Sequence, residues 1–192
     1  MTAISLKIIP FSTVEKWEAW LSRNHARSDG IWLRLYKKGS GEASITYTEA
    51  LDVALCHGWI DSQRGGYDAV SYLQKFSQRR ARSVWSKLNT GHAERLIRTG
   101  RMRPAGQRQI DMAKEDGRWA AAYASARGAV LPDDFLKAVA RNRKAKAFLA
   151  TLNRHNFYAI VYRLQTAKRP ETRVRRIRTF VAMLAKREKF HP

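Results

Sequence analysis

The stretch of sequence that decides the fold is residues 46–67, TYTEALDVALCHGWIDSQRGGY. Thr46 and Glu49 have the spacing of a capping box, and the apolar residues after them repeat at helical intervals as far as Gly58. A glycine suits the left-handed position just past a helix end. The residues that follow have strand character, and Gly65-Gly66 suits a two-residue hairpin turn. This stretch therefore predicts one helix followed by two antiparallel strands.

The flanking sequence adds a strand and more helices. Ser12 and Glu15 repeat the capping-box spacing ahead of a helix that we expect to end near His25. Residues 31–36 alternate with the period of a strand that has one buried face. From about residue 90 onward the apolar spacing is helical throughout. The sequence thus predicts an α+β fold, with a small antiparallel sheet of about three strands in residues 31–76 and flanking helices, followed by an all-helical basic half.

Length and composition favour one folded unit. The chain has 192 residues, of which 44% are hydrophobic, which is enough for a sizeable core and too apolar for a disordered chain. No internal repeat or low-complexity linker interrupts it. We expect residues 1–192 to form a single structural unit, with an α/β part over 1–89 and a helical part over 90–192.

The sequence shows no sign of a membrane span or a metal site. The first twenty residues contain no apolar run of signal-peptide length, and no stretch approaches the roughly 20 apolar residues of a membrane span. The one cysteine, Cys56, excludes an internal disulfide, and the five histidines lack ligand spacing. We therefore expect a cytoplasmic protein without a metal or other cofactor. The oligomeric state does not follow from the sequence.

The charge is distributed unevenly along the chain. Residues 1–78 hold nine basic and eight acidic residues, whereas residues 79–192 hold 28 basic and eight acidic residues, a net charge of +20. Such asymmetry is typical of a surface for nucleic acid, anionic lipid or an acidic protein, although ordinary solvated helix faces also produce it. Because the cations lie in patterned helical segments, we expect them on rigid helices rather than on a flexible tail.

One segment has the residue types of a catalytic site. Cys56, His57 and Asp61 lie within six residues of one another. Neighbours on a helix point about 100° apart, so Cys56 and His57 do not readily form a dyad, and Cys56 also continues an apolar stripe. His57 either binds helix-end carbonyls or acts as a general base. Asp61 either pairs with a nearby arginine or faces a site.

Two further segments have the composition of anion-binding sites. Residues 79–89 combine four cations with an indole, two hydroxyls and an amide, and either bind phosphate and a base or form a connector whose Trp85 fills the core. In residues 167–178, Arg173 and Arg176 share a helix face, which favours phosphate contacts over a merely solvated helix.

The aromatic residues of the expected strands allow two interpretations. They either form a stacking platform for single-stranded nucleic acid or belong to the core face of the sheet beneath helices. These residues are Trp32, Tyr36, Trp59, Tyr67, Tyr72 and Phe76.

Five motifs occur in order along the chain. They are Gly58–Asp61, Arg79–Asn89, Gly100–Gly106, Ala113–Trp119 and Ala167–Arg176. Together they make the chain similar, over about residues 28–187, to the YdeI/OmpD-associated family of bacterial proteins, often labelled bacteriocin-protection proteins. The resemblance implies an association with an outer-membrane porin and with protection against antimicrobial peptides. It brings no reaction and no catalytic residue.

Taken together, these features predict a non-catalytic protein of this type that binds an anionic partner, either nucleic acid or a phosphorylated ligand. One cleft is expected to be lined by Trp59, Asp61, Arg80, Trp85, Ser86, Lys87 and Asn89. Further anion contacts are expected from Arg79, Arg82, Arg101, Lys168, Arg173 and Arg176. The alternatives are a small enzyme acting on an anionic substrate, with Asp61 or His57 as general base, and an adaptor for an acidic protein.

Overall fold

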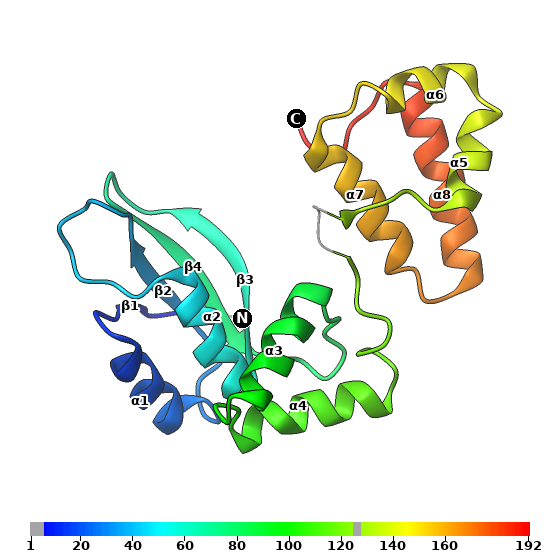
Figure 1. Cartoon of the computed structure of the whole chain (residues 1–192). Coiled ribbons are helices and arrows are strands. Elements are labelled where there is room, and N and C mark those ends of the chain that lie inside the picture. The colour runs from blue at the N-terminus through cyan, green and yellow to red at the C-terminus, as the bar shows by residue number, and fades with distance from the viewer. Residues whose placement is uncertain (1–5, 125–127) are drawn as a thin grey trace, which may run out of the picture. The chain divides into compact units, whose positions relative to one another are not determined.

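The computed structural model describes residues 6–124 and 128–192 (Figure 1). Its strands are β1 (Ile8–Pro10), β2 (Ile31–Tyr36), β3 (Trp59–Gly66) and β4 (Ser71–Gln78). Its helices are α1 (Val14–Asn24), α2 (Tyr47–Cys56), α3 (Lys87–Arg98), α4 (Pro104–Glu115), α5 (Asp133–Ala140), α6 (Arg143–Leu149), α7 (Arg154–Gln165) and α8 (Pro170–Ala185). The expected α+β class is confirmed. After β4, the regular elements that the structure describes are all helices, apart from an isolated β-bridge between Ser86 and Tyr123.

The four strands form one sheet in the order β1-β2-β4-β3. β4 is antiparallel to both β2 and β3, whereas β1 is parallel to β2. The prediction of about three antiparallel strands is therefore wrong in two respects: the sheet has a fourth strand, β1, and this strand pairs in parallel. β1 has only three residues, too few for an alternating pattern, and contains Pro10, which a sheet tolerates on an edge strand.

β3 and β4 form the predicted hairpin, but its turn lies later than Gly65-Gly66. Both glycines are inside β3 and pair with β4. The chain reverses over residues 67–70, where Asp68 Oδ1 accepts a hydrogen bond from the backbone N–H of Ser71 at 2.7 Å. Because an aspartate side chain can replace a backbone turn bond, Asp68 rather than the double glycine fixes the reversal.

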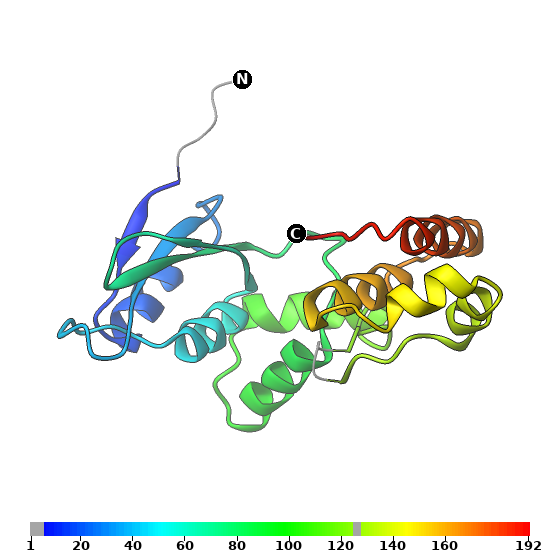
Figure 2. The ribbon, with the colours of Figure 1, turned by 90° about the horizontal axis from the view of Figure 1, so that it is seen from above.

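One face of the sheet packs against α1 and α2, which lie on the same side of it (Figure 2). Ile31, Leu33 and Leu35 of β2 are buried on this face. Trp17 of α1 packs edge-on against Phe76 of β4, with 5.8 Å between ring centroids. The apolar side chains that alternate along β2 thus meet the apolar stripe of α1.

The crossing of α2 and α4 is close enough to require glycine. A Cβ on Gly106 of α4 would lie 2.4 Å from the carbonyl oxygen of Leu55 and 2.5 Å from that of Cys56. Gly58, directly after α2, has a φ of 73°, and a Cβ there would lie 2.9 Å from a backbone oxygen of α4. Backbone therefore packs on backbone where these two helices meet.

Contacts divide the chain into two compact units, residues 1–85 with 89–121 and residues 86–88 with 122–192. In the second unit α5 to α8 enclose a core of their own, which includes Phe135, Ile160, Leu164 and Phe180. That the whole chain behaves as one structural unit, with parts meeting at residue 89, stays a prediction. No helix among the described residues is both long and apolar enough to cross a membrane.

Candidate functional site

The two tryptophans expected in a ligand cleft lie in the core of the first unit. Trp59 is 0% exposed, and its Nε1 donates a hydrogen bond to the carbonyl of His25 at 3.0 Å. Trp85 is 2% exposed and packs against Trp119, with 4.9 Å between ring centroids. Their rings therefore stabilise the fold and are not available to stack on a ligand.

Asp61, Arg80 and Asn89 of the same expected cleft have different surroundings. Asp61, on β3, accepts a hydrogen bond from the hydroxyl of Tyr47 at 2.9 Å. Partial burial and this neighbouring carboxylate raise the pKa of Tyr47. Arg80 is exposed and Asn89 is half-buried. Asp61 thus pairs with a phenol rather than with Arg79 or Arg80.

Arg79 is an internal cation rather than a surface anion contact. It is 6% exposed, and its guanidinium carbon lies 3.6 Å from the ring centroid of Trp85. Arg118, equally buried, donates to the carbonyl of Ser83 at 2.9 Å and to Asp116. The segment from Arg79 to Trp85 therefore behaves as a packed connector, the alternative noted above, with Arg82 exposed on it.

Ser86 and Lys87, the remaining residues of the expected cleft, belong to the second unit. The backbone N–H of Lys87 donates to the carbonyl of Tyr123 at 2.9 Å, and Ser86 is 8% exposed. The two tryptophans, Asp61 and Lys87 are thus held by separate local contacts.

Arg173 and Arg176 hold the second unit together. Arg173 donates to both oxygens of Asp134, at 2.7 and 2.8 Å, and to the carbonyl of Leu164 at 2.9 Å. The hydrogen bonds from Arg173 lower the pKa of Asp134. Arg176 donates to the carbonyl of Arg163. These arginines connect α8 to α5 and α7, while the nearby Lys168 is exposed.

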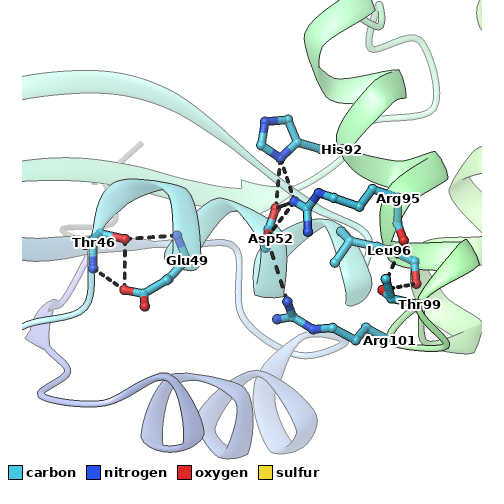
Figure 3. A network of polar contacts seen from close by, with 8 residues as sticks. All are labelled: Thr46, Glu49, Asp52, His92, Arg95, Leu96, Thr99 and Arg101. Carbon is cyan, nitrogen blue, oxygen red and sulfur yellow. Dashed lines mark hydrogen bonds and ion pairs between the residues drawn. The ribbon is translucent and has the colours of Figure 1, made fainter.

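A cluster that the sequence analysis missed surrounds Asp52 in the first unit (Figure 3). Asp52 is 6% exposed and accepts hydrogen bonds from His92 Nδ1 at 2.8 Å and from Arg95 Nη2 at 2.6 and 2.7 Å. Arg101, expected to bind anions, lies 3.8 Å from the same carboxylate. Burial raises the pKa of Asp52, but the hydrogen bonds from Arg95 and His92 outweigh it and hold the pKa below 3.8. An acid inside the apolar run of α2 was the available signal.

His57 and Cys56 do not have the geometry of catalytic groups. His57 is 5% exposed, with Nδ1 3.0 Å from the carbonyl of Val53 and Nε2 3.3 Å from Ser22 Oγ. Burial lowers the pKa of His57 and raises that of Cys56 to about 11. Within the residues that the structure describes, no three His, Cys, Asp or Glu side chains gather as a metal site requires.

The second unit contains a basic pocket of about 780 Å³ between α6 and the end of α8, called here the α6–α8 pocket. It is lined by Arg143, Lys144, Ala147, Phe148, Thr151, Ala185, Lys186 and Arg187. Four of these residues are cations and none is acidic. In the part of the chain that the structure describes, none of the four cations forms an ion pair. The other four lining residues are uncharged.

Arg187 reaches this pocket from a conformation that usually favours glycine. Its φ is 60°, a positive value that no other described non-glycine residue has. The backbone N–H of Arg187 donates to Leu184 at 3.1 Å, and that of Glu188 donates to Met183 at 2.9 Å, which is the Schellman pattern at the end of α8. An arginine in place of glycine costs about 1 kcal/mol there.

Comparison with family models gives two matched ranges, and the boundary between the two compact units lies in the interval between these ranges. Residues 9–109 match the model described as domain of unknown function (DUF8412). The chain belongs to the DUF8412 family. In this DUF8412 protein, residues 129–187 also match the model described as bacteriocin-protection, YdeI or OmpD-associated. That match confirms the family resemblance, over residues 129–187 rather than over 28–187.

The two matched ranges contain different candidate sites. The Asp52 cluster lies in the DUF8412 range. The α6–α8 pocket lies in the range 129–187, whose last residue is Arg187. Comparison with curated proteins and with solved structures finds no match for this DUF8412 chain.

Proposed function

We propose that this chain is a cytoplasmic, non-catalytic protein that binds an anionic partner, foremost nucleic acid, through the α6–α8 pocket. Four cations and no acidic residue line that pocket, and this observation carries the proposal. Cations held close together repel one another, and the neutralisation of phosphates by such a group releases counterions from the nucleic acid. The pocket is therefore electrostatically suited to a phosphate-bearing ligand.

The conformation of Arg187 supports the same proposal. Strained backbone tends to persist where a side chain is needed at a particular place. Glycine would relieve the strain at position 187 but would remove one of the four cations. The stability given up at this helix end is thus consistent with a binding role for the guanidinium group.

The test is a fluorescence-polarisation titration of the full chain with a labelled single-stranded oligonucleotide at two salt concentrations. If four phosphates are neutralised, the affinity should fall about 50-fold between roughly 50 and 200 mM salt. The double variant Lys144→Glu/Lys186→Glu should weaken binding at low salt by at least about tenfold.

The matched control is Lys137→Glu/Arg178→Glu, which changes the net charge equally at exposed positions of the second unit outside the pocket. Equal losses in both double variants would mean that binding reports net charge only, and no binding at low salt would remove the nucleic-acid partner. Competition by inorganic pyrophosphate at equal charge would indicate a small phosphorylated ligand, and competition by poly-glutamate would indicate an acidic protein partner.

The enzyme alternative has less support. Both ring nitrogens of His57 have partners, and the Asp61 carboxylate is bound by Tyr47. A general base needs a free lone pair within reach of a substrate proton, which the buried His57 ring does not offer, whereas Tyr47 occupies only Oδ2 of Asp61. We therefore keep binding, rather than catalysis, as the proposed function.

A further inference from the structure

The sheet of the first unit has a second face, opposite α1 and α2, that carries large side chains. Because side chains alternate along a strand, the burial of Ile31, Leu33 and Leu35 directs Trp32, Arg34 and Tyr36 to this outer face. All three of these outer residues are partly exposed. Same-face side chains on a strand are roughly 6.6 Å apart, which puts an indole, a guanidinium and a phenol in one row.

Neighbouring strands widen this row into a patch. Lys75 of β4 is opposite Trp32 in the ladder, and Ile8 of β1 is opposite Trp32 on its other side. Tyr67, in the turn after β3, is 50% exposed. The outer sheet patch is defined here as Ile8, Trp32, Arg34, Tyr36, Tyr67 and Lys75.

Arg34 is fixed in the middle of the outer sheet patch. Its guanidinium carbon lies 4.5 Å from the ring centroid of Tyr36 and 4.9 Å from that of Tyr67. Its Nε donates to Ser71 Oγ at 2.9 Å, and its Nη2 donates to Asp68 at 2.7 Å. The guanidinium of Arg34 and the rings of Tyr36 and Tyr67 are therefore held in place before any ligand arrives, which reduces the entropy lost on binding.

We propose that the outer sheet patch stacks the bases of single-stranded nucleic acid. Every base has a π-face, so a row of aromatic and guanidinium groups binds bases without regard to sequence. A four-stranded sheet whose open face carries aromatic residues is an established design for this purpose. Lys75 adds a positive charge beside the rings, and the carboxylate of Asp68 is paired with Arg34. Duplex bases are already stacked on one another, so the patch selects single strands.

This inference concerns a different unit from the α6–α8 pocket and does not require that pocket to bind. It also separates the six aromatic residues of the expected strands. Trp59 and Phe76 are fully buried, and Tyr72 is opposite the buried Leu35 in the ladder and so shares its face, whereas Trp32, Tyr36 and Tyr67 are available on the outer face. The sequence allowed either a stacking platform or a core face for these aromatic residues. We infer that each interpretation applies to one face of the sheet: the core to the face beneath α1 and α2, and the stacking platform to the outer face.

The test compares affinities for a 12-nucleotide single strand and for a duplex of the same sequence, using the full chain. Trp32→Leu with Tyr36→Leu keeps apolar side chains but removes the rings, and should weaken single-strand binding by at least about tenfold while leaving duplex binding unchanged. Trp32→Phe with Tyr36→Phe keeps the rings and should retain most of the affinity. Quenching of tryptophan fluorescence by the single strand should be smaller in the leucine variant than in the parent chain.

Circular dichroism and thermal unfolding check that each variant is folded. Equal single-strand affinity in the leucine variant and the parent would overturn the proposal, as would an equal loss for single strand and duplex. A phenylalanine variant as weak as the leucine variant would exclude ring stacking as the cause. The charge-reversal variants of the α6–α8 pocket should leave the preference for single strands intact, so failure of one proposal is distinguishable from failure of the other.

Discussion

Asp52 is a buried carboxylate, and its charge therefore has to be compensated by its neighbours. A carboxylate that is 6% exposed must be balanced by cations, which Arg95 and Arg101 of the following segment supply, while His92 adds a hydrogen bond. The cluster ties α2 to α3 and to the loop after it, so Asp52 acts as a structural anchor rather than as a reactive group (Figure 3).

We expect Asp52→Asn to lower the free energy of unfolding by about 2 kcal/mol, because Arg95 loses its carboxylate partner. The loss is not larger because Arg95 is partly solvated and retains some hydration. The pKa of Asp52 is lowered in the folded state, so its contribution is present above its ordinary pKa of 3.8 and is lost as the pH falls through the lower folded value. Urea unfolding between pH 7 and pH 3 measures this, with Asp111→Asn, an exposed acid of α4, as the control. An unchanged acid dependence in Asp52→Asn would contradict the assignment.

At Arg187 we expect a substitution to stabilise the folded chain rather than to destabilise it. Arg187→Gly should raise the free energy of unfolding by about 1 kcal/mol, because glycine adopts positive φ without strain. The same variant should bind the oligonucleotide more weakly, because the α6–α8 pocket loses a cation. Arg187→Ala is the control, since it removes the charge and keeps the strain. If Arg187→Gly were more stable and bound equally well, Arg187 would have no part in binding.

At the scale of elements, the α2–α4 crossing depends on Gly106. Gly91, in α3, is its natural comparison because it is also helical but has open space around the position of a Cβ. Comparing substitutions at the two positions therefore distinguishes the effect of helix propensity from the effect of close packing.

We expect Gly106→Ala to destabilise the chain by at least about 2 kcal/mol, since an added methyl group meets two backbone carbonyls that cannot move aside. Gly91→Ala should stabilise it by up to about 1 kcal/mol, the difference in helix propensity. Denaturant melts of the two variants give the comparison directly. Similar effects of both substitutions would show that the crossing is looser than described.

Elements were predictable where local chemistry sets them. The capping box of Thr46 and Glu49 and the end of α2 before Gly58 follow from nearest neighbours, and both occur as predicted. β1 was missed because it has three residues, and the hairpin turn was misplaced because Asp68 competes with the double glycine. The candidate sites were less predictable, since Arg173 meets Asp134 and Arg95 meets Asp52 across about 40 residues of sequence. Such partners depend on the tertiary fold, which periodicity does not reveal.

At the scale of the molecule, charge dominates. The chain carries a net charge of +21, and the eight carboxylates after residue 78 cannot pair with all 28 cations of that part. Polyanion binding should therefore depend strongly on salt.

We expect the slope of log affinity against log salt for a single strand to become less steep by about 1.4 in Lys144→Gln/Lys186→Gln, because two phosphate contacts are lost. Lys137→Gln/Arg178→Gln, at exposed positions of the second unit outside the pocket, should leave the slope unchanged. Polarisation titrations at four or more salt concentrations determine both slopes. A change of equal size in the two variants would place the phosphate contacts outside the α6–α8 pocket.

The glycine at the α2–α4 crossing also affects how a mutational scan of this protein should be interpreted. Position 106 will reject every other side chain whatever the protein binds, because the cause is the space between two helices. Intolerance there, measured by growth or by abundance, says nothing about a ligand. Position 187 is the more informative one, since a substitution that raises abundance while it lowers fitness would identify a residue retained for its interaction rather than for folding.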